Sequence, residues 1–214
     1  MKKIYFLIFS ILFLITSEIS AQNAKQTADV AVDKLLQTME REAFSADFML
    51  EITDKSMSQP QIATGHLTIK GRKFSLQSDE ISVFFDGKTQ WVYMPDVDEV
   101  SISEPDEKEI SDTNPVAMLA NFKAESVVRY TNKTSSKDTY YIEMVSKNLK
   151  SDIEKVELGL NKSNDNIVSI NQHNRNGSTM SLRLNNLKKG IVTSDKMFAF
   201  DKSKYPNVEI NDLR

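Results

Sequence analysis

The stretch from Ile81 to Pro95, ISVFFDGKTQWVYMP, carries the clearest fold signal in this chain. Apolar residues alternate with other residues up to Phe85, and Asp86-Gly87 interrupts the pattern before an aromatic segment with Trp91 and Tyr93. Alternation over a few residues is typical of a β-strand with one buried face, and Asp-Gly is a favoured pair for a two-residue hairpin turn. The stretch therefore predicts an antiparallel β-hairpin.

The same period of two recurs on both sides of this hairpin. Gly71-Arg72 and Asn176-Gly177 predict further tight turns between alternating segments. The other predicted strands are 46–52, 67–76 on both sides of the first of these turns, 100–103, 126–131, 139–145, 155–160, 167–173 and 178–184, with two short segments, 197–200 and 208–210, at the end. The chain should therefore contain about ten or eleven strands.

Helical spacing is confined to two places. Apolar residues recur at helical intervals from Ala28 to Met39, which predicts an amphipathic helix. Asn114-Pro115 is a typical helix start, with Asn as the cap and Pro in the first turn, and predicts a short helix over residues 116–122. Two or three helices in total are too few to cover both faces of a sheet.

These elements define the expected fold class. Strands that follow one another through short turns form an antiparallel sheet. A sheet of this size curls and must cover its apolar face. We therefore expect a mainly β fold with a few α-helices, in the form of an unclosed, half antiparallel β-barrel with the helices lying across its mouth.

The N-terminus is typical of a cleaved signal peptide over residues 1–21. Lys2 and Lys3 precede an apolar run from Ile4 to Ile15, and Ile19-Ser20-Ala21 resembles a cleavage site. A membrane anchor is the alternative, but a spanning helix needs roughly 20 apolar residues, more than this run supplies. Residues 22–214 would then form one domain, free in the periplasm. The chain has no cysteine, which excludes disulfides, thiolate zinc sites and an acylated cysteine anchor.

Charge and motifs argue against several function classes. The net charge of -3 and the lack of a basic stripe argue against nucleic-acid binding. His66 and His173 are far apart, and each lies within a strand pattern, where a half-exposed structural role is expected. No nucleophile elbow, phosphate-binding glycine loop or zinc-protease helix is present. We therefore expect a protein that is not an enzyme and that needs no metal or cofactor.

An acidic stretch runs from Asp96 to Asp112. Asp96, Asp98 and Glu99 lack the spacing and the central glycine of a calcium loop, so they are expected at a solvated hairpin tip. The stretch as a whole is either a solvated loop or a docking surface for a basic partner.

Four segments of this sequence, in order, resemble the LolA family. Ile81 to Pro95 resembles its strand, Asp-Gly-Lys-Thr turn and Trp-x-Tyr strand, and Gly65 to Gln77 (GHLTIKGRKFSLQ) resembles its G-x-L-x-[VI]-K-R-P-x-x-F pattern. Thr113 to Leu119 (TNPVAML) is similar to the family's lid helix. Residues 198–214 (FAFDKSKYPNVEINDLR) are similar to its closing F-x-F-x-x-P-x-G-V-x-V-x-D-x-R.

This resemblance implies an unclosed antiparallel barrel with a helical lid over an apolar cavity. It implies a monomeric periplasmic carrier that takes acylated lipoproteins from an inner-membrane ABC-type releasing complex and passes them to an outer-membrane acceptor. A carrier of another lipid or glycolipid with the same fold is one alternative. A sensing or interaction domain with a filled core is another, because a packed core explains alternating strands equally well.

The cavity lining can be predicted from the alternate positions of consecutive strands that should face the same side of the sheet, together with the lid helix. The predicted lining residues are Phe48, Leu50, Leu67, Ile69, Phe74, Val83, Phe85, Trp91, Tyr93, Met118 and Leu119. The family also has an arginine that latches the lid, placed after the lysine that corresponds to Lys70. Here Gly71 follows Lys70, so Arg72 either takes that role by bonding the carbonyls near Ala120 to Phe122, or is an exposed turn residue.

Overall fold

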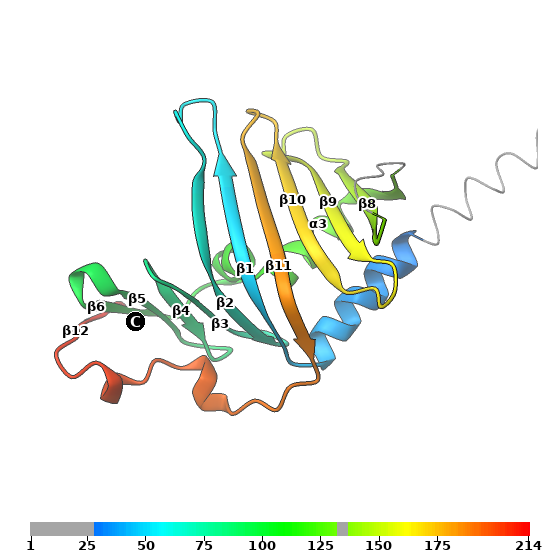
Figure 1. The fold of residues 1–214 in the computed structure, drawn as a ribbon. Coiled ribbons are helices and arrows are strands. Elements are labelled where there is room, and N and C mark those ends of the chain that lie inside the picture. The colour runs from blue at the N-terminus through cyan, green and yellow to red at the C-terminus, as the bar shows by residue number, and fades with distance from the viewer. Residues whose placement is uncertain (1–27, 132–136) are drawn as a thin grey trace, which may run out of the picture.

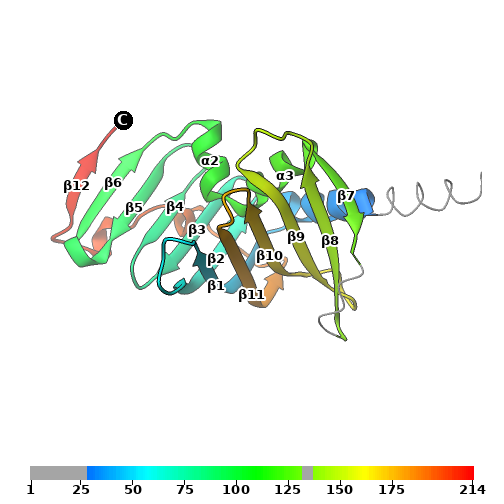
Figure 2. The same ribbon diagram turned by 90° about the horizontal axis from the view of Figure 1, so that it is seen from above.

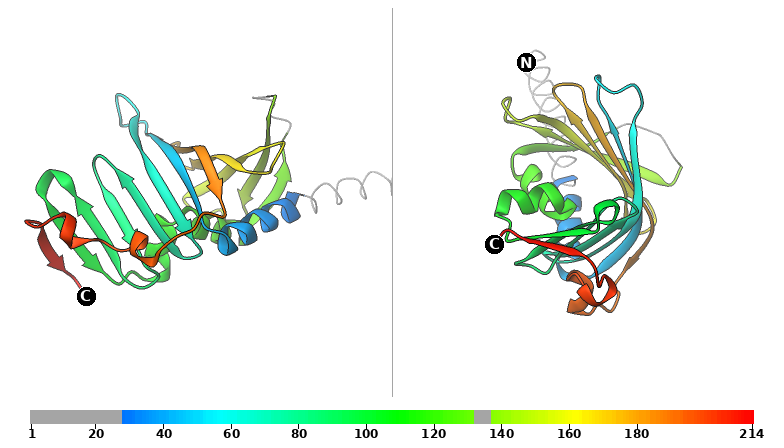
Figure 3. Two further views of the ribbon diagram at one scale, coloured as in Figure 1. Left: turned by 60° about the horizontal axis from the view of Figure 1, so that its bottom comes forward. Right: turned by 90° about the vertical axis from the view of Figure 1, so that its left-hand side faces the viewer.

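A twelve-stranded sheet curls around helices that lie on its concave side (Figures 1 and 3). The computed structural model describes residues 28–131 and 137–214. The predicted signal peptide, residues 1–21, lies outside the described residues. No helix in the described ranges is long and apolar enough to cross a membrane. The predicted fold class, an unclosed and mainly antiparallel half-barrel with helices, is confirmed.

The strand order across the sheet is β12-β6-β5-β4-β3-β2-β1-β11-β10-β9-β8-β7, and only the β12–β6 pair is parallel. Figure 2 shows this sheet from above, with β12 at one end and β7 at the other. The strands are β1 Phe44–Thr53, β2 Gln61–Lys70, β3 Lys73–Ser78, β4 Ser82–Phe85, β5 Gln90–Met94, β6 Glu99–Ser103, β7 Ser126–Tyr130, β8 Thr139–Ser146, β9 Ile153–Asn161, β10 Ile167–Asn174, β11 Thr179–Lys189 and β12 Glu209–Asp212.

Three helices of α type and three short 3-10 helices complete the described chain. The N-terminal helix covers residues 28–41, and α2 (Glu107–Thr113) and α3 (Pro115–Ala124) follow β6. The 3-10 helices are η1 Pro95–Val97, η2 Asp195–Phe198 and η3 Lys202–Lys204. The predicted strand at residues 197–200 was wrong, because Ser194 caps η2 through its hydroxyl and this segment pairs with no strand.

We call α2 and α3, the helices at the position of the expected lid, the lid region, and local capping explains where they begin. Asp106 and Glu109 form a reciprocal capping box that starts α2 inside the acidic stretch, where the sequence predicted only a loop with a short strand. The side chain of Asn114 accepts hydrogen bonds from the backbone N–H groups of Val116 and Ala117 and starts α3, as predicted. The same residue ends α2, because its N–H donates to the carbonyl of Ile110.

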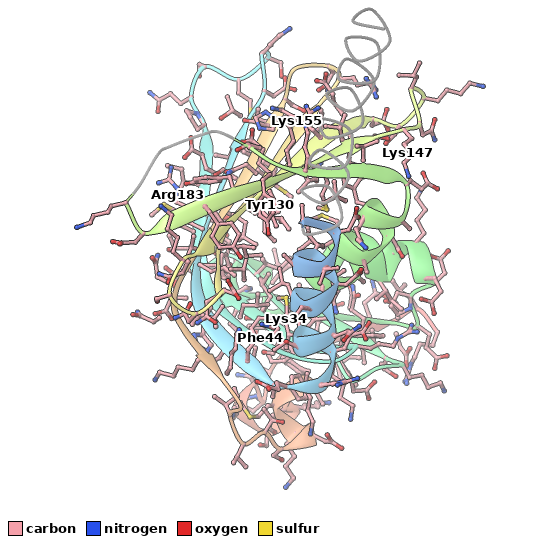
Figure 4. The ribbon with its side chains drawn as sticks, turned by 90° about the vertical axis from the view of Figure 1, so that its right-hand side faces the viewer. Lys34, Phe44, Tyr130, Lys147, Lys155 and Arg183 are labelled. Atoms are coloured by element: carbon pink, nitrogen blue, oxygen red, sulfur yellow. The ribbon has the colours of Figure 1, made fainter. Side chains whose placement is uncertain are left out.

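Register aligns the apolar side chains of neighbouring strands on the concave face. Ile69 faces Phe74, and Phe74 faces Phe85, across β2, β3 and β4. In the other half of the sheet, Ile142, Leu158 and Ile170 lie in one cross-strand row over β8, β9 and β10. Both rows belong to one buried cluster that includes the apolar side of the N-terminal helix. Figure 4 shows this helix lying against the concave face, with Phe44 beside it.

A second, smaller apolar cluster lies on the convex face. Tyr93 and Val100 pack there with Val208, and the ring of Tyr205 lies 4.4 Å from that of Tyr93. The C-terminal segment that carries η2 and η3 runs along this outer face, in contact with β3 and β4 (Figure 1). From β4 onwards the convex face is therefore apolar as well, since Phe84 of β4 also packs against Phe200 of the C-terminal segment.

The two halves of the sheet meet at the β1–β11 pair, which contains a bulge between Ser45 and Asp47. Asn186 has a left-handed backbone there (φ 51°), and its Nδ2 donates to the Asp47 carboxylate at 2.7 Å. The hydrogen bond from Asn186, followed by the contact with His66 at 3.0 Å, holds the pKa of Asp47 below its usual value. A bulge increases the local twist, so this pair helps to curl the sheet. His66 is half-exposed on its strand, as expected.

Gly65 permits a close approach of β2 to its neighbours. It faces Phe48 across β1 and β2, and an added Cβ would lie 2.0 Å from the carbonyl oxygen of Gln77 and 2.8 Å from the Phe48 ring. We expect Gly65→Ala to lower the free energy of unfolding by roughly 1–3 kcal/mol, as overpacking does. Urea denaturation measures this. Thr64→Ala, at the exposed neighbouring position, is the control and should change stability by no more than about 0.5 kcal/mol.

Candidate functional site

The helices cover only one end of the concave face. Along β1, Phe44, Ala46 and Phe48 are buried, whereas Leu50 and Ile52, towards the β1–β2 turn, are partly exposed. The turns of the β1–β2 and β10–β11 hairpins project away from the N-terminal helix (Figure 1). The concave face thus has a covered part and an open part.

The open part is a strip of partly exposed apolar side chains, which we call the open strip. Leu50 faces Leu182, and Ile52 faces Met180, across β1 and β11. The open strip consists of Leu50, Ile52, Met180 and Leu182. Leu76 and Val83 are also partly exposed, but they lie in the row of Leu67, beyond the row that contains Phe48 and Gly65. Apolar surface of this kind, contiguous and concave, is the ordinary lining of a site for an apolar ligand.

Nine of the eleven predicted lining residues come together on the concave face. The buried members of the cluster are Phe48, Leu67, Ile69, Phe74, Phe85 and Leu119, and those packed against it are Leu50, Val83 and Met118. The side chains of Phe74, Phe85 and Leu119 are at most 1% exposed. The covered part of the face is therefore closely packed in this conformation, and contact of these residues with a ligand stays a prediction.

The predicted positions of Trp91 and Tyr93 were wrong. Phe85 faces Gln90 directly, so Trp91 and Tyr93 project from the opposite, convex face. There they join the cluster with Val208. The two strands differ from the prediction because the loop between β4 and β5 has an even number of residues. Across such a hairpin, odd-numbered residues face even-numbered ones.

A groove of about 440 Å³ lies at the open end of the face, next to the β1–β2 hairpin. Its lining residues are Leu50, Ile52, Gln61, Ile62, Ala63 and Glu80. Sites for small molecules commonly span roughly 300–1,000 Å³, so the groove has a suitable size. Sequence reasoning missed all of these residues except Leu50. Alternation in β1 marked Ile52 as inward-facing. The groove itself exists because β2 extends past the end of β3, from Gln61 to Thr64, and the sequence does not show this.

Arg72 contacts the lid region, but not through the predicted carbonyls. Its Nη2 donates to Glu107 Oε1 in the first turn of α2 at 2.7 Å. The carbonyl oxygen of Phe122, near the end of α3, instead accepts from the Ser126 hydroxyl at 2.7 Å. The predicted partner was wrong because α2, a helix that the sequence did not reveal, lies nearer to the β2–β3 turn. The backbone carbonyl of Arg72 also accepts from Asn114 Nδ2, at 3.4 Å.

A second polar tie joins α3 to the N-terminal helix. Lys123 Nζ lies 2.6 Å from Asp33 Oδ1 and 3.8 Å from Asp29 Oδ1. The Lys123 side chain is only 18% exposed, whereas that of Asp33 is half-exposed. Ion pairs of this partly solvated kind contribute about 0.2–1 kcal/mol each. Both helices are therefore held mainly by apolar packing, with weak polar ties at their ends.

Within residues 28–131 and 137–214, no group of His, Cys, Asp or Glu side chains is arranged to hold a metal ion. His173 Nε2 lies 3.7 Å from Glu157 Oε2 on the convex face. Glu157 and Glu143 are buried there and share the Lys155 ammonium group, at 3.1 and 3.0 Å. Because opposite-charge pairs across strands stabilise a sheet, this cluster is interpreted as structural.

Comparison with known proteins identifies the family. The model of the family described as "Outer membrane lipoprotein carrier protein LolA" matches residues 40–201. The chain belongs to the LolA family. Proteins of the LolA family are carrier or binding proteins. A search of curated proteins found no match.

Solved structures resemble this chain in fold at low sequence identity. A conserved protein of unassigned function from Thermus thermophilus has a TM-score of 0.57 at 10% identity, covering 87% of this chain and 99% of its own. A LolA superfamily protein from Nitrosomonas europaea has a TM-score of 0.42 at 16% identity, covering 85% and 98%. The MucA/MucB complex of Pseudomonas aeruginosa gives 0.41 at 11% identity, covering 82% and 61%.

The tie between α3 and the N-terminal helix can be tested by substitution. We expect Lys123→Met to speed amide hydrogen exchange in α3, because the helix loses its ion pair with Asp33. Global stability should fall by less than about 1 kcal/mol. Lys108→Met, at an exposed position of α2, is the control. Equal exchange rates in the two variants would contradict a role for Lys123 in holding α3.

Proposed function

We propose that this LolA-family protein is a periplasmic carrier that binds the acyl chains of lipoproteins on its concave face and ferries them from the inner to the outer membrane. Residues 1–21 would direct export and be removed. The releasing partner would be an inner-membrane ABC-type complex, and an outer-membrane acceptor would receive the cargo. No cofactor or catalytic step is needed.

One observation carries this proposal: the apolar concave face is only partly covered, and the helices that cover it are held by apolar contacts that a hydrocarbon chain can also make, together with weak polar ties. Burying an acyl chain contributes about 0.8 kcal/mol per methylene, so one long chain contributes on the order of 10 kcal/mol. Separating the ion pairs of Arg72 and Lys123 costs about 0.2–1 kcal/mol each. An acyl chain that enters at the open strip covers the apolar sheet in place of a helix, so its burial has to outweigh the exposure of that helix's own apolar side as well as the loss of these ion pairs.

Release follows from the same balance. When cargo leaves for an acceptor that buries its chains better, the helices return to the apolar face and the ion pairs form again. The closed conformation, in which Phe74, Phe85 and Leu119 are nearly inaccessible, is then the empty state. A ligand that binds one conformation better than the other shifts the population in this way.

The close packing of the covered part also favours a second candidate, an interaction domain with a filled core. In that case the helices would remain in place, and only the open strip and the rim would meet a partner. A carrier of another lipid or glycolipid is the remaining alternative within the same fold. Either kind of carrier takes hydrocarbon into the concave face, whereas an interaction domain does not.

Substitution of adjacent residues on opposite faces of β1 distinguishes these functions. We expect Leu50→Asp to reduce the binding of a dipalmitoylated lipopeptide by at least roughly tenfold, because a carboxylate replaces apolar lining. Met49→Asp, on the convex face at a 36% exposed position, should leave binding unchanged. Native mass spectrometry of the purified protein measures the bound lipid. Equal binding by both variants would remove the concave face as the site and favour the interaction domain.

The contact between Arg72 and Glu107 supplies a test of release. We expect Arg72→Leu and Glu107→Gln to take up lipopeptide normally but to release it more slowly, because both weaken closure of the lid region. Transfer from the loaded protein to liposomes measures the rate. Lys108→Met is again the control, and normal release by both variants would show that this contact does not govern closure.

A further inference from the structure

Strand lengths leave one edge of β2 free beside the groove. β1 pairs with β2 from Phe44 to Ile52, but β3 pairs only with residues Gly65–Lys70 of β2. Residues Gln61 to Thr64 therefore extend beyond the shorter β3–β4 hairpin. Among the described residues, no backbone partner other than β1 is found for this segment. A free strand edge can pair with an extended peptide through main-chain hydrogen bonds.

The groove lies at this overhang. Register places Leu50, Ile52 and Ala63 on the concave side, where they form an apolar floor. The floor continues along β11 through Leu182 and Met180, which face Leu50 and Ile52. Hydrocarbon in the groove would therefore follow the open strip towards the helices.

Glu80 is the one charged residue among those that line the groove. It occupies the β3–β4 turn with Asp79, and the turn is held by Ser78. The backbone N–H and the hydroxyl of Ser78 both donate to the Ile81 carbonyl, at 2.9 and 3.0 Å, and the Ile81 N–H donates to the hydroxyl at 3.2 Å. These bonds fix the turn that carries Glu80 at the end of the groove, with Asp79 next to it in the sequence.

The carboxylates of Asp79 and Glu80 are exposed, and neither forms an ion pair within 4.0 Å among the described residues. Acidic residues near the β2–β3 turn, at the opposite end of these strands, do have cationic partners. Glu107 pairs with Arg72 at 2.7 Å, and Asp195 pairs with Lys73 at 2.9 Å. The end of the groove thus presents negative charge that the protein itself does not neutralise.

These three features together select a class of ligand. The apolar floor suits an acyl chain, and the free edge of β2 suits an extended peptide backbone. The carboxylates suit a positive charge and repel a lipid with an anionic phosphate. A glycolipid has no backbone N–H groups to pair with a strand edge.

We propose that the groove beside β2 binds the peptide portion of an acylated cargo, and that it selects peptides with basic residues next to the lipid. The inference rests on the proposed carrier function. The acyl chains lie along the open strip, the peptide extends along residues Gln61 to Thr64, and its cationic side chains face Asp79 and Glu80. The protein is therefore a carrier with a preference for part of its cargo rather than a carrier for any hydrocarbon.

The test compares matched probes on the purified full chain. The probes are dipalmitoylated Cys-Ser peptides that continue with a tetralysine or a tetraglutamate segment, measured by calorimetry at low and at high salt. We expect the lysine probe to bind roughly tenfold more tightly at low salt, a difference of about 1.4 kcal/mol, and we expect high salt to reduce this preference. A lysine probe with N-methylated backbone amides should bind several-fold more weakly, because it cannot donate to the strand edge.

A double variant, Asp79→Asn with Glu80→Gln, should lose most of the preference while retaining affinity for the glutamate probe. The matched control is Asp152→Asn with Glu154→Gln, at exposed carboxylates in the half of the sheet that contains β9. It should keep the full preference. Equal affinity of the unaltered protein for both probes, or an unchanged preference in the Asp79 and Glu80 variant, would overturn this inference and leave the carrier function standing. Failure of both probes to bind would instead count against the carrier function itself.

Discussion

The structure depends on one constraint: a long antiparallel sheet that does not close has an apolar concave face that it cannot bury against itself. Cross-strand register aligns Ile69, Phe74 and Phe85 in one row and aligns Ile142, Leu158 and Ile170 in another. Because the apolar residues stand on one side, they must be covered by something other than the sheet. The helices on that side are too short to cover it fully, so an open strip remains at the end that bears the β1–β2 and β10–β11 hairpins.

The contacts that hold the helices on the concave face determine how readily a ligand can displace them. Burial of apolar surface contributes about 25 cal/mol per Å² whichever apolar group provides the contact, so a hydrocarbon chain can replace a helix with little change in that contribution. The balance is then set by the polar contacts that only the helices make. The contacts of Arg72 with Glu107 and of Lys123 with Asp33 are few and partly exposed. A face covered in this way can exchange its helices for a ligand, as a core sealed on all sides cannot.

The concave face becomes polar towards β6. Val92 continues the apolar row from Val83 onto β5, but its partner on β6 is Ser101, and the partners of Gln90 and Met94 are Ser103 and Glu99. The aromatic residues Trp91 and Tyr93 stand on the convex face under the C-terminal segment. The apolar concave surface therefore ends at β5.

The sequence by itself determined the half-barrel. Alternation marked most of the strands, Gly71-Arg72 marked a tight turn, and Asn114-Pro115 marked the start of α3, because these signals depend on a few neighbouring residues. The tertiary structure decided what the sequence could not. The faces of Trp91 and Tyr93, the parallel β12 and the partner of Arg72 all depend on segments distant in the chain. The groove arises from a difference in the lengths of β2 and β3, which no local pattern records, because strand ends are set by pairing rather than by the strand's own residues.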